Sequence, residues 1–513
     1  MLPIVFAAVL STVHLEADVP AAGGDYVDVP FTVPGGTVEI QITHSDGSDY
    51  DILDWGVWSP DGFRGWAGGL TDDAIIGVAQ SSRSYLRGPI TPGMWTVSIG
   101  KAKLDADGGH YSIDIECRDN ATLPVQPSAA YSPVVLADAR RWYKGDFHVH
   151  SIQSGDATAS FDAIATLAQS RGLDFVNLSD HNTYSQHSLV AAVQPSYPAF
   201  LFLRGSEITT YSGHTNSVGT SSYVEHRLGY NGRTVQDIAD DVAAQDAVMI
   251  VNHPVLDLGA ECIGCAWRHV DDTPWGQVAA LELITGNFDI GSQAFVPRVI
   301  ALWDQLLDQG HRIAVVGGSD DHRAGNDTGP TASQIGSPTT LVLADNLSEA
   351  AIIDALRKGR TIVQLSGPDD PIVDMKIGIT EIGGETGELG HVTVDVHITG
   401  GAGTIVQLWR DGVKLGQQDV SGADAKLTFD DTPGDALRRY RLEVINDLNQ
   451  RVVVTSHIYV RGIPDDGCGC SSRDARGGWV FALALLALRR RRRARRRYPY
   501  KEPRRMSSSP PPS

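Results

Sequence analysis

Histidines and carboxylates stand at the ends of apolar, strand-like runs in the middle of the chain, and this pattern constrains the fold most. The first case is Asp146-Phe-His148-Val-His150, where alternation along a strand places both imidazoles on one face. A lone His in a strand is usually a core residue. Six at strand ends or in adjoining loops, with carboxylates at short spacings, instead predict a metal site. The residues concerned are His148, His150, Asp156, Asp180, His181, Glu207, His214, His253, Asp320 and His322.

Strand-like runs alternate with helical patterns between residues 141 and 366. Ser160 is expected to cap a helix that ends at Gly172, and the apolar run 175–178 follows it. Ser348 is expected to cap the last helix. Repeated units of this kind predict an α/β fold with a parallel, barrel-like sheet. In such a fold the site lies at the carboxyl ends of the strands.

The regions on either side of these units have the alternating pattern of β-strands. Residues 22–118 and 367–462 each predict a β-sandwich domain, and residues 119–140 form a linker with three prolines. The run 406–415 predicts a hairpin with an Asp-Gly turn. Residues 1–21 are a candidate truncated signal segment, because a short apolar stretch is present without the leading Lys or Arg.

Charge is distributed unevenly along the chain. Eleven Lys/Arg and one Glu give residues 489–513 a charge of +10, which leaves −30 for the rest of a chain whose net charge is −20. An acidic body disfavours nucleic acid as a partner, because phosphate backbones are bound by clustered cations.

The five cysteines are too few for a disulfide scaffold. None belongs to the predicted metal site, which excludes a structural zinc site of the Cys type there. For Cys262 and Cys265, a local disulfide and two free thiols are both favoured over structural zinc.

The motifs resemble those of the PHP (polymerase and histidinol phosphatase) family. They are Asp-Phe-His148-Val-His150-Ser, Ser179-Asp180-His181-Asn, Glu207 followed by Gly-His214-x-Asn, Asn-His253-Pro and Ser319-Asp320-x-His322. They occur in the expected order within the region 141–366, which is about 225 residues long. The resemblance implies a distorted seven-stranded β/α barrel over residues 141–366. Gly-His214-Thr-Asn and the N-terminal sandwich resemble the carbaryl-hydrolase-like metallohydrolase branch.

The resemblance also implies divalent metal ions, with Zn, Mn and Fe as candidates and two to three ions per chain. His148, His150, Glu207 and Asp320 would hold the first, and Glu207 would bridge to a second held by His214 and His253. Asp156, His181 and His322 would hold a third. The family motif Ser-Asp-Gly reads Ser154-Gly155-Asp156 here, so the acid stands one position later. Four other histidines match no motif and are interpreted as surface or loop residues: His187, His226, His269 and His311.

The expected activity is hydrolysis of an ester-type bond, either a phosphoester, a carboxylic ester or a carbamate. A water that bridges two divalent ions would lose its proton at a pKa of roughly 7 and attack phosphorus or carbonyl carbon. A His or Asp would protonate the leaving group. Asp180, Glu207, His322 and Arg323 are the candidate catalytic residues, with Asp180 orienting a ligand. Arg323 and Arg204 would contact an anionic substrate or form ion pairs at the rim.

The substrate is expected to be a small molecule, uncharged or singly charged rather than a phosphomonoester. Few cations accompany the predicted ligands, whereas a phosphate dianion is typically bound by Arg or Lys. The loop after His253 supplies Leu256, Leu258, Trp267 and Trp275, which suit an apolar leaving group.

Two other functions compete with the hydrolase. One is a cell-surface binding protein whose barrel has lost its activity, and the other is a polymerase-associated proofreading module. The complete set of ligands favours the enzyme over the first. The absence of a basic surface pattern in either flanking region disfavours the second.

Residues 463–513 end the chain with Cys468-Gly-Cys470, an apolar run of about a dozen residues and an arginine cluster. The run is shorter than the roughly 20 residues of a stable membrane span. The segment resembles the myxobacterial C-terminal sorting tag (MYXO-CTERM). That resemblance implies export, processing near the cysteines and attachment to the cell surface or outer membrane, with a lipid on Cys468 or Cys470 as anchor. The sequence makes no prediction of the oligomeric state.

Overall fold

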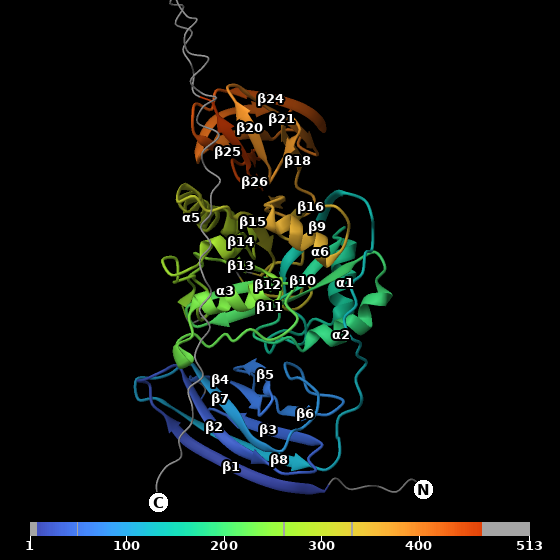
Figure 1. Ribbon diagram of the computed structural model, residues 1–513, viewed down its shortest axis with the longest axis vertical. Coiled ribbons are helices and arrows are strands. Elements are labelled where there is room, and N and C mark those ends of the chain that lie inside the picture. The colour runs from blue at the N-terminus through green and yellow to red at the C-terminus, as the bar shows by residue number, and fades with distance from the viewer. Residues whose placement is uncertain (1–7, 49, 260–261, 330–331, 464–513) are drawn as a thin grey trace, which may run out of the picture. The chain divides into compact units, whose positions relative to one another are not determined.

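The computed structural model describes residues 8–48, 50–259, 262–329 and 332–463 (Figure 1). The tag, with Cys468 and Cys470, lies outside the described residues. The described part of the chain contains no helix with the length and hydropathy that a membrane span requires.

The described residues of the central region, 141–366, form six α-helices. They are α1 (Phe161–Ser170), α2 (Gln186–Val193), α3 (Val235–Ala244), α4 (Phe288–Ala294), α5 (Val296–Asp308) and α6 (Glu349–Arg357). Its strands are β9 (Arg141–Val149), β10 (Phe175–Leu178), β11 (Leu201–Thr210), β12 (Gly213–Val218), β13 (Val248–Val251), β14 (Val278–Thr285), β15 (Ala314–Gly318), β16 (Thr339–Ala344) and β17 (Thr361–Gln364).

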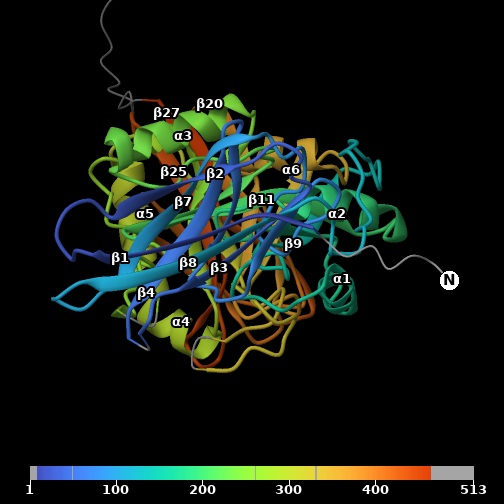
Figure 2. The same cartoon turned by 90° about the horizontal axis from the view of Figure 1, so that it is seen from below.

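The N-terminal region consists of two four-stranded antiparallel sheets, ordered β1-β8-β3-β6 and β2-β7-β4-β5 (Figure 2). Both contribute to one core, which contains Ile40, Trp55, Trp95 and Ile113. Alternate residues point to opposite faces of a strand, so the alternating sequence builds this core. The strands are β1 (Val9–Val19), β2 (Tyr26–Val33), β3 (Glu39–Ser45), β4 (Ile52–Ser59), β5 (Gly62–Gly68), β6 (Ala74–Gly77), β7 (Gly93–Lys103) and β8 (Gly109–Arg118).

The first strand differs from the sequence-based expectation. Val9–Val19, which falls within the candidate signal segment 1–21, forms β1 and pairs with β8 along most of its length. Apolar and polar residues alternate in this stretch, which is the pattern of a strand with one face on a sheet. Residues 9–19 are therefore part of the N-terminal sheet.

The central sheet carries the predicted site residues. Its strand order is β15-β14-β13-β12-β11-β10-β9-β16-β17, and six of the seven strands from β9 to β15 run in the same direction. The two ends of this seven-strand series meet, because His150 N–H donates to Asp321 O (3.0 Å) and Asp320 N–H donates to His148 O (2.9 Å). These contacts bring Asp320 beside the two histidines of β9.

The expectation of a parallel sheet is wrong in part, since the sheet is mixed. β12 is antiparallel to β11 and β13, and β16 is antiparallel to β9 and β17. Only Tyr211 and Ser212 lie between β11 and β12. Two residues can join antiparallel strands, whereas a parallel connection needs a crossover of a dozen residues or more.

The helix caps predicted from the sequence are confirmed. Ser160 Oγ accepts from Ala163 N–H at the start of α1, and Gly172 follows the helix with φ of 74°. Ser348 Oγ accepts from Ala351 N–H at the start of α6. Both caps satisfy backbone donors that have no partner inside a helix. Helices α3 and α5 bury their apolar faces with β13, β14 and β15 in one core.

The C-terminal region, residues 367–463, is made of β-strands. One sheet has the order β19-β18-β21-β24, and the others continue the central sheet through the β17–β26 pair. The hairpin predicted over 406–415 is confirmed as β22–β23, with Asp411 and Gly412 at φ of 50° and 77°. The strands are β18 (Ile372–Ile377), β19 (Thr380–Glu381), β20 (Glu385–Leu389), β21 (Val392–Thr399), β22 (Ile405–Arg410), β23 (Val413–Asp419), β24 (Asp424–Asp431), β25 (Leu437–Ile445), β26 (Arg451–Thr455) and β27 (Ile458–Gly462).

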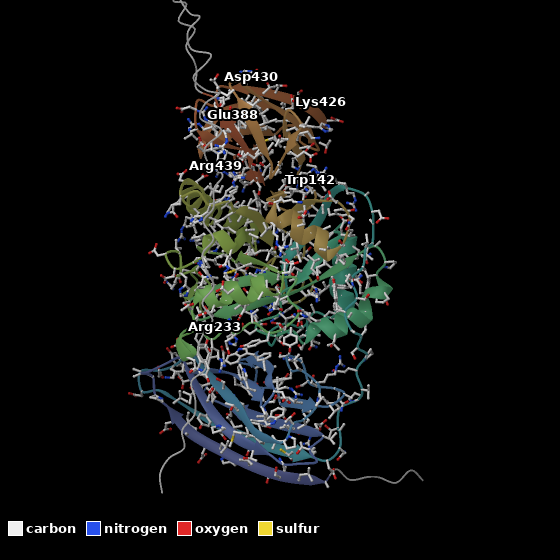
Figure 3. The ribbon with its side chains drawn as sticks, in the orientation of Figure 1. Trp142, Arg233, Glu388, Lys426, Asp430 and Arg439 are labelled. Carbon is white, nitrogen blue, oxygen red and sulfur yellow. A yellow bond between two sulfur atoms is a disulfide. The ribbon has the colours of Figure 1, made fainter. Side chains whose placement is uncertain are left out.

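Side chains hold the C-terminal region against the central region. Arg439, labelled in Figure 3, pairs with Asp308 at the end of α5 (2.7 Å), and Arg441 pairs with Asp304 on the same helix (2.6 Å). Trp142 at the start of β9, also labelled there, packs against the C-terminal core. These contacts fix α5 and β9, the latter of which leads to the predicted site.

Candidate metal centre

Glu207 lies at the centre of the predicted site, buried on β11. Its Oε2 is 3.4 Å from His148 Nε2, 3.6 Å from His150 Nε2 and 2.9 Å from His181 Nδ1. On the other side, Oε1 is 3.2 Å from His214 Nδ1 and 3.6 Å from His253 Nε2. The two carboxylate oxygens therefore face two different groups of imidazoles.

The structure brings together all four residues of the first predicted metal. One candidate ligand atom from each of His148, His150, Glu207 and Asp320 lies within 4.8 Å of the others. Asp320 Oδ1 is 3.1 Å from His148 Nε2 and 3.0 Å from His150 Nε2. Imidazole nitrogens and carboxylate oxygens suit Zn, Mn and Fe.

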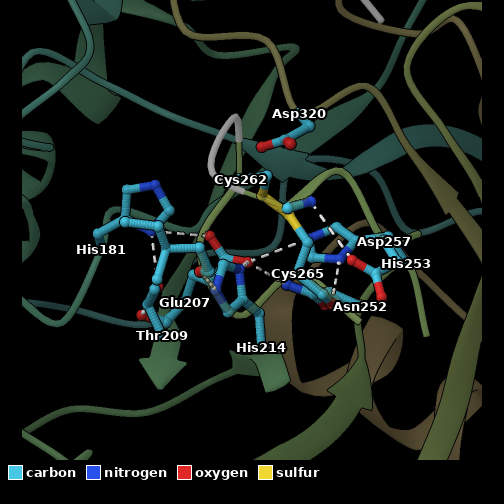
Figure 4. The surroundings of a disulfide bond; sticks show 12 residues. His181, Glu207, Thr209, His214, Asn252, His253, Asp257, Cys262, Cys265 and Asp320 are labelled. Carbon is cyan, nitrogen blue, oxygen red and sulfur yellow. Dashed lines mark hydrogen bonds and ion pairs between the residues drawn. A yellow bond between two sulfur atoms is a disulfide. The ribbon is translucent and has the colours of Figure 1, made fainter. Parts of the chain in front are cut away.

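The second predicted set lies beside a disulfide (Figure 4). Cys262 is bonded to Cys265, and Cys265 Sγ lies within 4.8 Å of candidate ligand nitrogens of His214 and His253. His253 Nδ1 is 3.0 Å from Cys265 O, and His214 Nε2 is 3.1 Å from Ile263 O. When His253 Nδ1 and His214 Nε2 carry the protons that these carbonyls accept, the other nitrogen of each ring has a free lone pair. These nitrogens, His253 Nε2 and His214 Nδ1, face Glu207 Oε1.

The third predicted set is also assembled. Asp156 Oδ2 is 3.2 Å from His181 Nε2 and 3.3 Å from His322 Nε2. His322 Nδ1 is 2.8 Å from Asp320 O, so a proton on Nδ1 leaves the Nε2 lone pair facing Asp156. The acid that stands one position later than in the family motif therefore still reaches both histidines.

Buried polar atoms without partners show that this donor set fits metal ions. His148 Nε2, His150 Nδ1 and Glu207 Oε2 are buried and make no hydrogen bond within the described residues. Buried polar atoms are nearly always paired, so two unpaired ones that lie 3.4 Å apart, His148 Nε2 and Glu207 Oε2, need an explanation. A divalent cation between His148 Nε2 and Glu207 Oε2 would satisfy both.

The charges of the site perturb its titrating groups. Burial raises the pKa of Glu207, but the positive charges of His148, His181 and His214 outweigh it and hold that pKa well below its usual range. Burial lowers the pKa of His150 to about 3, and the charges of His322 and His181 act in the same direction. In the metal-free protein Glu207 is therefore ionised and His150 neutral at neutral pH, whereas burial is outweighed by the neighbouring carboxylates, which raise the pKa of His148 and of His181, so metal binding there would release protons.

The backbone is strained at three residues of the centre. Asn182, His253 and Asp320 have positive φ values of 51°, 25° and 58°. Non-glycine residues rarely adopt such angles, which persist where the surrounding structure imposes them and which concentrate at functional sites. Two of these residues are predicted ligands.

Asp180 supports the centre without facing it. Its carboxylate accepts hydrogen bonds from Ser151 N–H (2.6 Å) and Ser151 Oγ–H (2.8 Å), and burial raises its pKa to about 7. These bonds fix the loop that follows His150. Its position agrees with the expected orienting role.

The two arginines expected near an anionic substrate lie elsewhere. Arg323 is half exposed, lies 3.4 Å from Asp327, and lines a separate hollow beside α1 rather than the cavity at the centre. Arg204 pairs with Glu349 (2.6 Å) and lies over the ring of Tyr131. Of the two expectations for these arginines, their placement agrees with ion pairs and not with substrate contact, which removes Arg323 from the candidate catalytic residues.

Two supporting residues were not identified from the sequence. Glu282, buried on β14, lies 3.0 Å from His148 Nδ1 through Oε1 and accepts from His253 N–H through Oε2 (2.8 Å). Asn252 Nδ2 donates to Glu207 Oε1 (2.8 Å). The sequence offered one signal for Asn252, its place directly before His253 at the end of β13. Glu282 gave none, since it stands within an apolar run.

A cavity of about 800 Å³ opens over the centre. The predicted ligands Asp156, His181, Glu207, His214, His253, Asp320 and His322 line it. Leu256 and Leu258 line it as predicted, whereas Trp267 and Trp275 are buried in the core to which α3 and α5 also contribute. His187 and His226 are buried rather than at the surface, and His226 reaches the cavity wall.

The N-terminal region forms one wall of the same cavity. The residues it contributes are Asp46, Ile52, Asp54, Trp66, Ala67, Gly68, Gly69, Leu70, Thr71 and Ala102. The described residues that line the cavity include no Lys or Arg. The cavity over the candidate metal centre is therefore lined in part by a region that the sequence suggested only as a flanking sandwich.

No family model matches the sequence, and no curated protein matches it. Several solved structures are similar at low identity. One is a two-domain protein from Bacteroides vulgatus that contains a predicted PHP-like metal-dependent phosphoesterase; identity is 20%, the match covers 65% of this chain and 99% of that one, and the TM-score is 0.35.

Another similar structure is a proposed metal-dependent phosphoesterase from Bifidobacterium adolescentis, at 14% identity over 37% of this chain and 92% of that one, with a TM-score of 0.28. A third is β-glucuronidase 2 from Bacteroides uniformis, at 10% identity over 86% of this chain and 74% of that one, with a TM-score of 0.20. At such low scores, the function has to be inferred from the geometry of the centre.

Proposed function

We propose that the protein is a metal-dependent hydrolase that cleaves ester-type bonds in a small molecule. The observation that carries this proposal is the position of Glu207, whose two oxygens face two separate groups of imidazoles. A carboxylate in that position can bridge two cations. Two or three divalent ions, with Zn, Mn and Fe as candidates, fit the three ligand sets.

The bound ions would supply Lewis acidity and an acidified water as nucleophile. The residues of the chain supply the rest. Glu207 and Asp320 offset the positive charge of the centre, and Glu282 fixes the orientation of the His148 ring. Asp180 holds the loop after His150 through Ser151. His322 lines the cavity at the third set, where a leaving group can accept a proton.

The cavity favours an uncharged or singly charged substrate over a phosphomonoester. A phosphate dianion needs cations besides the metals, and the described lining contains no Lys or Arg. Leu256, Leu258 and Phe295 instead provide an apolar surface. A carboxylic ester, a carbamate or a phosphodiester fits this lining.

The geometry also supports the finer architecture implied by the PHP resemblance. The strands from β9 to β15 form a series of seven neighbours. The contacts of His150 with Asp321 and of Asp320 with His148 bring the first and the last strand of this series together. We infer that these strands form a distorted barrel and that β-sandwich domains flank it. We also propose that the protein belongs to the carbaryl-hydrolase-like branch. The two N-terminal sheets around one core support the first sandwich.

The test is metal analysis of the full chain followed by a hydrolysis screen with Zn, Mn and Fe. The screen contrasts an aryl phosphate, an aryl phosphodiester, an aryl carboxylic ester and an aryl carbamate. The expected result is two to three bound ions per chain and a higher kcat/KM for the last three substrates. Protein that binds the ions but hydrolyses none of the four would instead be a cell-surface binding protein.

Two variants make the screen specific. Glu207→Gln should bind less metal and lose activity, while Glu388→Gln, an exposed residue of the C-terminal region, should change neither. A protein that binds no metal, or a Glu207→Gln variant with full turnover, would overturn the proposal.

We also propose that the protein is exported and held at the cell surface by its C-terminal tag, which lies outside the described residues. The Cys262–Cys265 disulfide supports export, because disulfides persist mainly in oxidising compartments. Intact-mass measurement of protein from the native host should find the arginine-rich end removed. Full-length protein in the cytosol would refute this.

A further inference from the structure

The N-terminal region reaches the metal centre through the hairpin between β11 and β12. Tyr211 stands in the two-residue turn of that hairpin, and its hydroxyl donates to Asp54 Oδ2 on β4 (3.0 Å). Gly100 on β7 makes room for this contact, since a Cβ there would lie 2.1 Å from the Tyr211 hydroxyl oxygen. The Tyr211 ring also stacks on Tyr26 of β2, with ring centroids 5.6 Å apart.

A second contact fixes the same wall beside the third metal set. A Cβ on Gly155 would lie 2.3 Å from Ala67 O, so the loop that carries Asp156 packs directly on the backbone near the end of β5. The N-terminal region is thus attached on both sides of Asp54. This attachment holds the Asp54 carboxylate at a fixed place in the cavity wall.

Asp54 has one oxygen left for a ligand. Oδ2 accepts the hydrogen bond of Tyr211, while Oδ1 makes no hydrogen bond within the described residues. The apolar side chains of Ile52, Trp66 and Leu70 line the cavity around it, together with Gly68 and Gly69, whose lack of side chains leaves space. An acceptor in an apolar wall discriminates strongly, because a ligand without a matching donor leaves it unpaired.

We propose that Asp54 binds the substrate of the hydrolase through Oδ1 and selects molecules that carry a hydrogen-bond donor, such as an ammonium or hydroxyl group, on an apolar body. That the ligand is a substrate rests on the proposed hydrolase function, but its binding to Asp54 does not depend on catalysis. The donor lies at the end of the ligand that contacts the N-terminal wall. The bond to be cleaved lies at the metal centre, across the cavity.

The test measures binding of three matched probes to the full chain by calorimetry: benzylammonium, benzyl alcohol and benzyl methyl ether. They share the ring and differ in carrying a cationic donor, a neutral donor or no donor. Wild-type protein should bind the ether weakest, by about tenfold relative to the best donor. The order of the first two probes decides between an ammonium and a hydroxyl as the selected group.

Asp54→Leu should remove the preference among the probes, and Asp46→Asn, which changes another acid of the same wall, should retain it. Circular dichroism and the unfolding midpoint check that Asp54→Leu folds. Asp54→Asn is the second variant. At a pH above about 7, the value to which burial raises the pKa of Asp54, it should weaken benzylammonium more than benzyl alcohol, because the acceptor stays while the charge is lost.

The outcomes separate this inference from the proposed function. A donor preference that depends on Asp54, in protein that hydrolyses no ester, supports the ligand site and overturns the hydrolase. Ester hydrolysis with equal affinity for all three probes, or a preference that survives in Asp54→Leu, overturns the role of Asp54.

Discussion

Glu282→Gln tests how the protein orients its predicted metal ligands. The two oxygens of Glu282 have different partners, His148 Nδ1 at 3.0 Å and His253 N–H at 2.8 Å. Glutamine has nearly the same shape but only one acceptor oxygen. Whichever way the amide turns, its NH₂ group faces either the backbone N–H of His253 or the imidazole of His148.

The magnitude follows from the bonds that change. Hydrogen bonds to a charged group contribute about 1.5–3 kcal/mol each, and a buried donor without a partner costs a further 1–3 kcal/mol or so. The free energy of unfolding of the metal-free variant should therefore be lower than that of the metal-free wild type by about 2–4 kcal/mol. Residues that orient metal ligands contribute about 10–100-fold to metal affinity, so binding should weaken by that factor.

The assays are urea unfolding of metal-free protein and metal affinity by competition with a chelator. Glu443→Gln is the matched control. Glu443 is fully buried in the C-terminal region and pairs with Arg441 and Arg451. The substitution Glu443→Gln should therefore lower the free energy of unfolding and leave metal affinity unchanged. If Glu282→Gln retains metal affinity within twofold, Glu282 does not orient the ligands and the reasoning fails.

Three further predictions address the centre and its surroundings. Chelation of the metals should abolish hydrolysis, and readdition of one candidate ion at a time should restore it to different extents; activity unaffected by an exhaustive chelator would contradict the metal requirement. Gly155→Ala should lower the free energy of unfolding by about 1–3 kcal/mol, because its Cβ would meet Ala67 O, and metal analysis should show loss of the third ion first. Burial lowers the pKa of His187 to about 4. Between pH 6.5 and 4 the unfolded chain therefore takes up a proton at His187 that the native state does not. The free energy of unfolding should fall by up to about 3 kcal/mol over that range as the pH drops. His187→Asn should remove that part of the pH dependence in urea titrations; an unchanged slope would refute it.

The residues that the sequence placed together lie together because strand ends are recognisable in it. His148 lies near the end of β9 and His150 directly follows it, His181 follows β10 closely, and His253 follows β13. The carboxyl ends of strands that run the same way meet at one edge of a sheet, so these residues could be grouped without knowing any distance. The helix caps at Ser160 and Ser348 depend on equally local chemistry.

The rest depends on contacts between distant parts of the chain. Glu282 stands in the apolar stretch Val278–Thr285, where it has the appearance of an isolated surface residue, and only the position of β14 beside β13 turns it toward His148. Asp54 is more than 150 residues from Tyr211, and no periodicity connects them. Trp267 and Trp275 follow His253 closely in the sequence, yet both are buried in the core that includes residues of α3 and α5.

The register of the β11–β12 hairpin explains why one carboxylate can face two groups of histidines. Glu207 pairs with Asn216 and Thr209 pairs with His214, so all four residues lie on the same face of the sheet. The bridge between His181 and Glu207 brings a histidine from the β10 side, while β13 brings His253 from the β12 side. A shift of one residue in the hairpin would turn His214 to the opposite face. Because the turn of Tyr211 and Ser212 fixes this register and Tyr211 also contacts Asp54, the same two residues set both the position of His214 and the attachment of the N-terminal wall.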